Sequence, residues 1–381
     1  MKDQYVILTG SKNNAGDYLI KFRAKQLFSD LRPDREIIDF NGWESLTKEK
    51  LNIVNESRAL ILMGGPAFVE NMVPKVYALL ENLEDIKVPI IMMGVGWKSE
   101  RGNWENTYSY PLNSRSKELL DRIRESGYQS SVRDYHTLNA IRFNGADNFM
   151  MTGCPAYYSK EFINKEFNPK DVSKVAFSLG VSFVESPSME KLIKENILAC
   201  RDKFVDFDFE VVFHHSLDKK KFNKAYKSSS RHVVKHNEFA DWLTKNNIKY
   251  VDISGSAENL INYYSSVDFH LGYRVHAHIF MNSISRKSIL ISEDGRAKGV
   301  KSAIGGVVLD GYLDFKKGLV SKVLNKFIPF YDRFTANNDL TKELISEINY
   351  ESKINFIRLK NSRKQIDNNF IIMEQFLKQL P

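Results

Sequence analysis

Short apolar runs alternate with amphipathic stretches along most of the chain. The runs are rich in Val and Ile and lack the polar alternation of a half-exposed strand. They therefore predict strands buried on both faces, as in parallel sheets. The expected strands are 5–9, 36–40, 59–63, 88–93, 129–132 and 148–151, then 174–179, 209–214, 250–253, 267–271, 288–291 and 306–309.

Between these runs, apolar positions recur at helical spacing. The expected helices are 114–125, 135–143, 189–204, 238–245, 257–264 and one beginning near 275. This β-α-β rhythm indicates an α/β protein with doubly wound sheets. The rhythm lapses at 160–173 into Lys, Asn, Glu, Pro and Asp, which suits a boundary between domains. We expect Rossmann-like domains at 1–165 and 166–335, with ligands in a cleft between them at the carboxyl ends of strands.

The last segment, 336–381, is expected to be a helical extension. Ile366, Phe370, Met373, Leu377 and Leu380 recur at steps of three and four and form an apolar stripe. Such a stripe predicts packing, either back onto the first domain or onto a second copy of the chain. A homo-oligomer is thus one of the two expectations.

Composition narrows the class of partner. The chain has 381 residues, 43% hydrophobic and 27% charged, which is typical of a soluble globular protein, and a formal net charge of +8. The basic residues are scattered, which suits an anionic substrate or peripheral association with a membrane surface and argues against nucleic acid. No apolar run approaches the ~20 residues of a membrane span. Two distant cysteines and the absence of a signal peptide predict a cytoplasmic protein, acting there or at the inner face of the membrane.

The most informative stretch follows the run 267–271. After the turn at Gly272, a helix is expected from about Val275, and Arg274, His276 and His278 surround its start. The first turn of a helix presents unpaired N–H groups that suit phosphate or carboxylate, and arginine adds a planar two-oxygen fork. A structural alternative stays open, in which these side chains cap carbonyls or pair with buried acids.

Other strand ends carry further candidates. The loop after the first run holds Asn14 and Asp17 before a helix, and Gly64-Gly65 follows the third run. Small residues leave room for a ligand but equally permit tight helix packing. Arg133, after the fifth run, either pairs with its neighbour Asp134 or points into the cleft.

His214 ends a run in the second half and is expected either to reach the cleft of Arg274 or to be structural. The chain has no phosphate-binding Gly-Lys-Ser/Thr loop, dinucleotide fingerprint, serine-nucleophile elbow or clear metal cluster. We therefore expect no metal and no cofactor.

Together these motifs resemble the polysaccharide pyruvyl transferases. The resemblance rests on Asn13-Asn-Ala-Gly-Asp17, Gly64-Gly65, Ser131-Val-Arg-Asp134, Gly153-Cys-Pro-Ala156 and, above all, Tyr273-Arg-Val-His-Ala277 followed by Glu293-Asp294. Their order and spacing run through about residues 5–300. The chain departs from the pattern in three places. Pro66 stands where a third glycine is usual, Cys154 stands where an aspartate is usual, and the chain offers Arg296 and Lys298 where a lysine is expected.

The resemblance implies a GT-B-like arrangement of two Rossmann-like domains and transfer of a carboxyethylidene (pyruvyl ketal) group. The donor would be phosphoenolpyruvate and the acceptor two hydroxyls of a sugar, in a cell-surface polysaccharide (an exopolysaccharide) or a lipid-linked oligosaccharide precursor. It implies donor binding in the second domain and acceptor binding in the first.

The same resemblance assigns roles to single residues. His276 would act as general acid and Arg274 would stabilise the departing phosphate. Arg133 would provide a further anion contact, and Asp17 and Glu293 would contact sugar hydroxyls or act as base. Two alternatives remain: a nucleotide-sugar glycosyltransferase of GT-B type, and a non-catalytic binding protein of the same fold.

Overall fold

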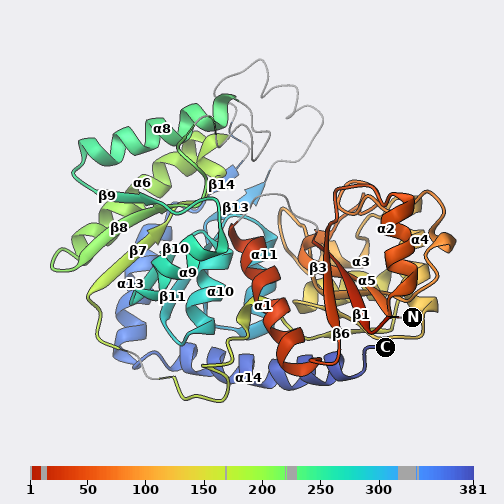
Figure 1. Ribbon diagram of the computed structural model, residues 1–381. Coiled ribbons are helices and arrows are strands. Elements are labelled where there is room, and N and C mark those ends of the chain that lie inside the picture. Colours follow the sequence, from red (N-terminus) through yellow and green to blue (C-terminus); the bar gives the residue numbers. More distant parts are fainter. Residues whose placement is uncertain are drawn as a thin grey trace. The chain divides into compact units, whose positions relative to one another are not determined.

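The protein contains two six-stranded parallel sheets (Figure 1). The structure is a computed structural model, and it describes residues 2–9, 15–167, 170–218, 220, 230–315, 332 and 334–381. One sheet belongs to unit 1, which comprises Met1–Lys165, Lys298–Ile304 and Lys364–Pro381. The other belongs to unit 2, which comprises Glu166–Ala297 and Gly305–Arg363. Each of the twelve sheet strands overlaps a predicted apolar run, and the α/β class with two Rossmann-like sheets is confirmed.

The sheet of unit 1 has the order β2-β1-β3-β4-β5-β6. Its strands are β1 (Gln4–Thr9), β2 (Glu36–Asn41), β3 (Ala59–Phe68), β4 (Ile90–Trp97), β5 (Ser130–Val132) and β6 (Phe149–Met151). The intervening helices are α1 (Ala15–Leu31), α2 (Lys48–Glu56), α3 (Glu105–Tyr108), α4 (Ser114–Glu125) and α5 (Tyr135–Phe143). The strand order reverses between β1 and β3, where ligands of doubly wound sheets bind.

Two strands of unit 1 are longer than the apolar runs indicated. We predicted that Gly64-Gly65 follows the third strand, but β3 continues to Phe68 and β4 continues to Trp97. The reason is close strand packing. A Cβ at Gly64 would lie 2.5 Å from the carbonyl oxygen of Gly94, so only glycine allows the ladder to run on.

The sheet of unit 2 has the order β12-β11-β10-β7-β8-β9, and its order reverses between β7 and β10. Its strands are β7 (Lys174–Ser178), β8 (Asp208–Phe213), β9 (Lys249–Asp252), β10 (Phe269–Gly272), β11 (Lys287–Ser292) and β12 (Val307–Asp310). A short antiparallel pair, β13 (Tyr312–Phe315) and β14 (Phe334–Ala336), was not predicted.

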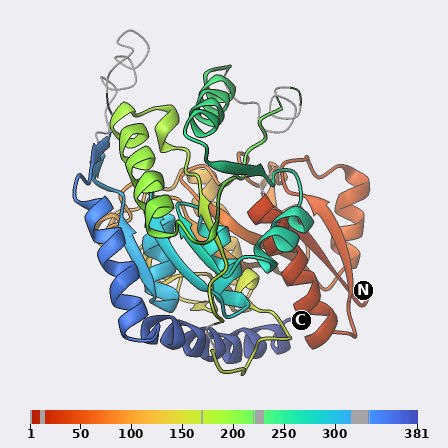
Figure 2. The same cartoon turned by 90° about the vertical axis from the view of Figure 1, so that its left-hand side faces the viewer.

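Three helices of unit 2, at 187–203, 230–245 and 340–353, contribute side chains to one apolar core. The helices of this unit include α6 (Pro187–Lys203), α8 (Ser230–Lys245), α9 (Ala257–Ser265), α10 (Val275–Ser283) and α13 (Leu340–Lys353), with the first residues of α11 (Gly295–Ile304). Helix α6 contacts α13, as Figure 2 shows, and α9 contacts α10. The core includes Phe177, Leu192, Ile193, Leu271 and Ile289, all at most 2% exposed.

The last part of α14 (Ile357–Lys378) and the C-terminus belong to unit 1. Ile366, Met373 and Leu377 of the apolar stripe are fully buried there. Arg32 donates hydrogen bonds to the carbonyl oxygens of Leu377 and Leu380, at 3.1 and 2.9 Å, which ties the end of the chain to α1. Among the described helices, none has the length and apolar character needed to cross a bilayer.

Candidate functional site

In unit 2, the reversal of strand order places Arg274 beside the end of β7. Gly272, which ends β10, has φ +120°, and a Cβ there would lie 2.4 Å from the carbonyl oxygen of Ser178. Only glycine permits this approach. The chain then turns, and the Arg274 N–H donates to Ser178 Oγ at 3.0 Å as α10 begins. The sequence prediction of a glycine turn before a helix start is confirmed at this position.

The half-buried Arg274 side chain contacts two groups of its own unit. Nε donates to the carbonyl oxygen of Leu179 at 2.7 Å, and Nη2 lies 2.9 Å from His215 Nδ1. A guanidinium group only donates, so His215 must accept at Nδ1. The fork predicted to grip an anion is thus engaged by a carbonyl and an imidazole.

A buried chain of hydrogen bonds supports the residue that fixes Arg274. Asn282 Nδ2 donates to the carbonyl oxygen of His278 at 2.9 Å and lies 3.2 Å from His278 Nε2. His278 Nδ1 is 2.7 Å from Ser288 Oγ, which is 2.8 Å from His270 Nδ1. His270 Nε2 is 2.8 Å from Ser178 Oγ.

The donor and the acceptor of each hydrogen bond in this series follow from the contact between Asn282 and His278. A carbonyl can only accept, so the amide nitrogen of Asn282 points at His278, and His278 Nε2 accepts. His278 Nδ1 then donates to Ser288, Ser288 donates to His270, and His270 donates to Ser178. Both histidines are neutral in this arrangement, as burial requires: it lowers the pKa of His278 to about 3 and that of His270 well below its usual value.

His278 was predicted to contact substrate, but both of its ring nitrogens are engaged by Ser288 and Asn282. His276 lies buried in the first turn of α10. His214 is buried with Nε2 2.7 Å from the hydroxyl of Tyr264. Burial, and then the charges of Arg274, His270 and His276, hold the pKa of His214 well below its usual value.

Glu293, at the start of the loop after β11, has one oxygen fixed and one without a partner. Its Oε2 accepts hydrogen bonds from the backbone N–H groups of Val181 and Ser182 at 2.7 and 3.1 Å. Its Oε1 is buried and has no hydrogen-bond partner within the described residues. A carboxylate positioned in this way can accept a hydrogen bond from a ligand hydroxyl.

In unit 1, Arg133 follows β5 and is only 4% exposed. Its Nε lies 3.5 Å from Asp134 Oδ2, and among the described residues neither Nη1 nor Nη2 has a hydrogen-bond partner. The side chain occupies space that Gly96 leaves empty, since a Cβ there would lie 1.9 Å from Arg133 Nε. A buried guanidinium group with two unpaired nitrogens suits an anion.

The thiol of Cys154 lies near Arg133, at a position where the sequence resemblance led us to expect an aspartate. Burial raises the pKa of that thiol to about 11, although the charge of Arg133 acts in the opposite direction. The thiol is therefore neutral near pH 7 and offers no charge to pair with the guanidinium. The carboxylate of Asp134 lies beside Nε of Arg133, and the two terminal nitrogens remain available for a ligand.

Asp17 and Gly65 lie together where the strand order of unit 1 reverses. Asp17 is buried in the first turn of α1, and Gly65 has φ +107° with its Cβ position 3.3 Å from Asp17 Oδ1. Gly64, next to it, packs against Gly94 of β4 and supports the strand pairing. Asn14 was also predicted here but lies outside the described residues.

Sequence reasoning missed a cluster of three histidines in unit 2. One ring nitrogen from each of His215, His232 and His236 lies within 4.8 Å of the other two. The predicted helix began at Glu238, whereas α8 begins at Ser230, so the His-x-x-x-His spacing was not placed on a helix. That spacing was the signal available in the sequence.

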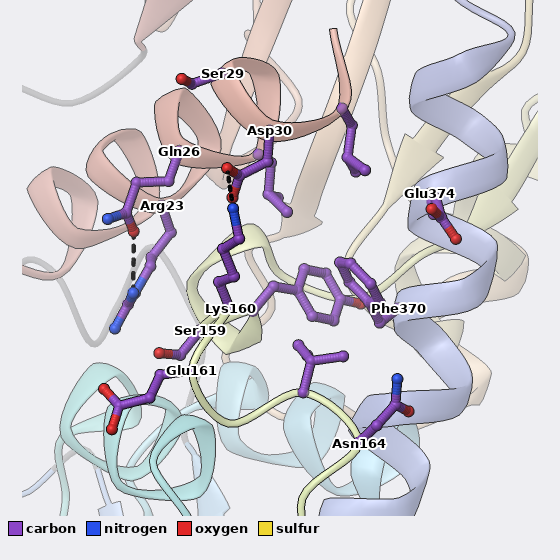
Figure 3. Close-up of a pocket in the computed structure, with 14 residues that line it drawn as sticks. Arg23, Gln26, Ser29, Asp30, Ser159, Lys160, Glu161, Asn164, Phe370 and Glu374 are labelled. Atoms are coloured by element: carbon purple, nitrogen blue, oxygen red, sulfur yellow. Dashed lines mark hydrogen bonds and ion pairs between the residues drawn. The ribbon is translucent and has the colours of Figure 1, made fainter. Parts of the chain in front are cut away.

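A separate cavity of about 930 Å³ lies in unit 1, between α1, the segment 158–164 and α14 (Figure 3). Asp30 and Lys160 form an ion pair of 2.7 Å there, and Arg23 donates to Gln26 at 2.9 Å. None of the predicted site residues lines this cavity.

The sequence pattern of the polysaccharide pyruvyl transferase family matches residues 14–280. A comparison with curated proteins found no match. Solved structures with a similar fold include an E. coli trehalose-6-phosphate protein bound with UDP-2-fluoro glucose, at TM-score 0.53 and 9% identity over 99% of each chain. Others are S. aureus MnaA with UDP (TM-score 0.48, 11% identity, 97% of this chain and 92% of that one) and Methanocaldococcus jannaschii UDP-GlcNAc 2-epimerase (0.45, 12%, 91% and 99%). This likeness concerns the fold, which is of the GT-B type.

Proposed function

The chain belongs to the polysaccharide pyruvyl transferase family, and we propose that it transfers a carboxyethylidene group from phosphoenolpyruvate to two hydroxyls of a sugar. The acceptor is a sugar of a cell-surface polysaccharide or of its lipid-linked precursor. The observation that carries the proposal is Arg274, fixed where the strand order of unit 2 reverses and held by contacts that an anion can replace.

The donor needs cations because phosphoenolpyruvate carries a carboxylate and a phosphate on three carbons. In the proposed complex, Arg274 exchanges its contact with His215 for phosphate oxygens, and its planar fork binds two of them at once. Ser178 keeps the main chain of Arg274 in place during this exchange. Charge grows on the phosphate as it departs, so a fixed guanidinium stabilises the transition state more than the ground state.

The bonds and protons of the reaction balance without a further reactant. Two sugar oxygens form bonds to the central carbon of phosphoenolpyruvate, and the bond from that carbon to the phosphate oxygen breaks. One proton is added to the methylene carbon, which becomes a methyl group, and the second hydroxyl proton leaves with inorganic phosphate. His276, in the first turn of α10, is proposed to deliver the proton to carbon.

The remaining candidates receive roles that fit their surroundings. Oε1 of Glu293, which has no hydrogen-bond partner among the described residues, accepts a hydrogen bond from an acceptor hydroxyl, with Oε2 held by two backbone N–H groups. His278 acts through Ser288 and the hydrogen-bond chain, as a positioning residue. In unit 1, Arg133 binds a second anionic group of the substrates, and Asp17 with Gly65 lies at the acceptor side.

The test combines turnover and binding in one set of variants. Phosphate release that requires both phosphoenolpyruvate and a sugar acceptor should fall by at least about 100-fold in Arg274→Lys, because lysine keeps the charge and loses the fork. Arg286→Lys is the matched control, since Arg286 pairs with Asp268 at 2.8 Å just before β11 begins. Wild-type turnover in Arg274→Lys would contradict the role of Arg274.

Thermal stabilisation separates this function from its alternatives. Phosphoenolpyruvate, but not UDP-sugars, should raise the melting temperature of the wild type and not that of Arg274→Ala. Stabilisation by a nucleotide sugar alone would instead favour a glycosyltransferase. If neither ligand stabilises the protein and no phosphate is released, the chain is a binding protein of this fold.

A further inference from the structure

Three histidines that the proposed reaction leaves unused lie together at one end of unit 2. His215 follows β8, and His232 and His236 lie on α8. One ring nitrogen from each is within 4.8 Å of the other two. We propose that His215, His232 and His236 form a binding site for a divalent transition metal ion of the zinc class. Imidazole groups are the preferred nitrogen ligands of such ions.

The helix presents two of the ligands on one face. Residues four apart lie one turn above each other, and the rings of His232 and His236 are stacked, with centroids 4.4 Å apart and planes at 18°. The ring of His215 stands nearly perpendicular to both, at centroid distances of 5.4 and 5.7 Å. The three side chains therefore converge from a helix and from the end of a strand.

One ligand already has the orientation of a metal-bound histidine. His236 Nδ1 lies 2.9 Å from the carbonyl oxygen of His232. A carbonyl only accepts, so Nδ1 carries the proton and the lone pair is on Nε2. Histidines that bind metals through one nitrogen commonly donate the other N–H to a carbonyl or a carboxylate, which fixes the ring.

The histidines are in the charge state that a metal needs. Burial lowers the pKa of His232 to about 4 and that of His236 to about 3, and the same cause places the pKa of His215 well below its usual value. Protons then compete little with a metal near pH 7. Within the part of the chain that the structure describes, the charges that act on the cluster include those of Arg274, which lowers the pKa of His232, and of Glu185, which raises it.

Metal binding requires a short movement. Nitrogens that share a tetrahedral zinc ion at about 2.0 Å are about 3.3 Å from one another. The rings must therefore approach by roughly 1.5 Å at most from their present separation. His215 and His232 are half-buried, whereas His236 is buried and packed against Phe183 and Phe213.

Metal binding also excludes the contact between Arg274 and His215. With Nδ1 accepting from the guanidinium group at 2.9 Å, neutral His215 carries its proton on Nε2. A metal on Nδ1 takes the place of Arg274, and a metal on Nε2 moves the proton to Nδ1, where it faces another donor. Either way Arg274 must leave His215, which, on the proposed function, releases the residue that binds the donor phosphate.

The site can be tested with Co²⁺, whose visible absorption reports tetrahedral nitrogen coordination. Protein without an affinity tag is titrated with Co²⁺, and Zn²⁺ is then added in competition. We expect one saturable Co²⁺ per chain, and His232→Asn and His236→Asn should each weaken binding by at least about tenfold. His136→Asn is the control, because His136 lies in unit 1 outside the cluster. Melting curves without metal establish that each variant is folded.

The outcomes separate a metal site from other histidine clusters. Absence of saturable Co²⁺ absorption in the wild type, or equal affinity in the two cluster variants and the control, would overturn the proposal. So would stabilisation by inorganic phosphate that is lost in both cluster variants, with no effect of Co²⁺ or Zn²⁺ on the wild type, which would indicate that the cluster is an anion site. None of these readouts depends on pyruvyl transfer, so they distinguish failure of the metal site from failure of the proposed function.

Replacing Arg274 should strengthen Co²⁺ binding, whereas replacing a histidine of the cluster should weaken it. Because Arg274 competes for His215 and adds positive charge, Arg274→Ala should bind Co²⁺ at least about fivefold more tightly than the wild type. A purely structural role of the cluster predicts no such gain. Unchanged or weaker Co²⁺ binding in folded Arg274→Ala would contradict the mutual exclusion.

Discussion

The two units each carry an arginine just after a sheet strand, and the two side chains differ in what surrounds them. Arg133 of unit 1 is 4% exposed, and within the described residues its terminal nitrogens have no hydrogen-bond partner. Arg274 of unit 2 is half-buried and contacts the carbonyl oxygen of Leu179 and the ring of His215. The terminal nitrogens of Arg133 can bind an anion without giving up a hydrogen bond to a described residue, whereas Arg274 must first give up its contact with His215.

This difference predicts different energetic roles. Burying a charge without a full set of partners costs several kcal/mol, so Arg133 lowers the stability of unit 1 until an anion is bound. Arg274 is compensated within unit 2, so a ligand gains only the difference between its own contacts and those it replaces. Anion binding should therefore stabilise unit 1 more than unit 2.

The largest expected gain in stability is that of Arg133→Met combined with Asp134→Asn. Methionine fills the same space without a charge, and asparagine keeps the hydrogen bond from the Thr137 N–H without leaving a buried carboxylate unpaired, so the free energy of unfolding of unit 1 should rise by about 1–4 kcal/mol. Stabilisation of unit 1 by inorganic phosphate should disappear in the same variant. Chemical denaturation, with and without ligand, measures both effects.

Arg274→Met is the matched control for this comparison. It removes the hydrogen bond to Leu179 and the contact with His215, so the stability of unit 2 should not rise. If Arg133→Met combined with Asp134→Asn destabilised unit 1 instead, Arg133 would be a structural residue and the comparison between the two arginines would fail.

The second prediction concerns the hydrogen-bond chain of unit 2, which runs from His278 to Ser178, the residue that holds the main chain of Arg274. Ser288→Ala leaves His270 Nδ1 and His278 Nδ1 without their partner, at about 1–3 kcal/mol each, so unit 2 should lose about 2–6 kcal/mol. Ser131→Ala of unit 1 removes a single bond, from the Gly94 N–H, and should cost about half as much. Equal losses in the two variants would show that the chain adds nothing beyond single hydrogen bonds.

The sequence was sufficient for the strands because a doubly wound sheet buries them on both faces, which leaves a continuous apolar run. The sequence did not predict where an element begins or ends when tertiary contacts determine its length. β3 and β4 extend beyond their apolar runs because Gly64 fits against Gly94, and α8 begins eight residues before the predicted start at Glu238.

The site was predictable as positions at strand ends, but the state of each side chain was not. Arg133 was predicted either to pair with Asp134 or to point into a cleft, and only the structure shows that its terminal nitrogens lack partners among the described residues. His278 shares the helix start with Arg274, yet its bond to Ser288 depends on a residue of β11 that helical spacing does not relate to it.

A third prediction tests how unit 1 holds Arg133. A Cβ at Gly96 would lie 1.9 Å from Arg133 Nε, so Gly96→Ala should displace the guanidinium group, at a cost of about 1–3 kcal/mol in stability, and should abolish anion binding in unit 1. In an Arg133→Ala background the same substitution should cost little, because the space is vacant. A double-mutant cycle measures this coupling, and additive effects of the two substitutions would contradict it.

The smallest expected effect is a difference between the two units in how the free energy of unfolding depends on pH. Of the eight histidines, His136 alone lies in unit 1, and unit 2 holds the others, including His278 with its pKa lowered by burial to about 3. Below the unfolded pKa of about 6.5 the unfolded chain binds a proton that folded His278 does not take up until near pH 3. The contribution of His278 is therefore fully present above pH ~6.5 and falls as the pH is lowered, by on the order of 2 kcal/mol at pH 5.

His278→Gln tests this directly, because glutamine keeps a donor for Ser288 and removes the titrating ring. The difference in unfolding free energy between pH 7 and pH 5, measured by urea denaturation of unit 2, should be about 2 kcal/mol smaller in His278→Gln than in the wild type. The same difference in unit 1 should not change. If both units kept their wild-type pH dependence in the variant, His278 would be protonated in the folded protein, and its Nε2 could not accept a hydrogen bond from Asn282.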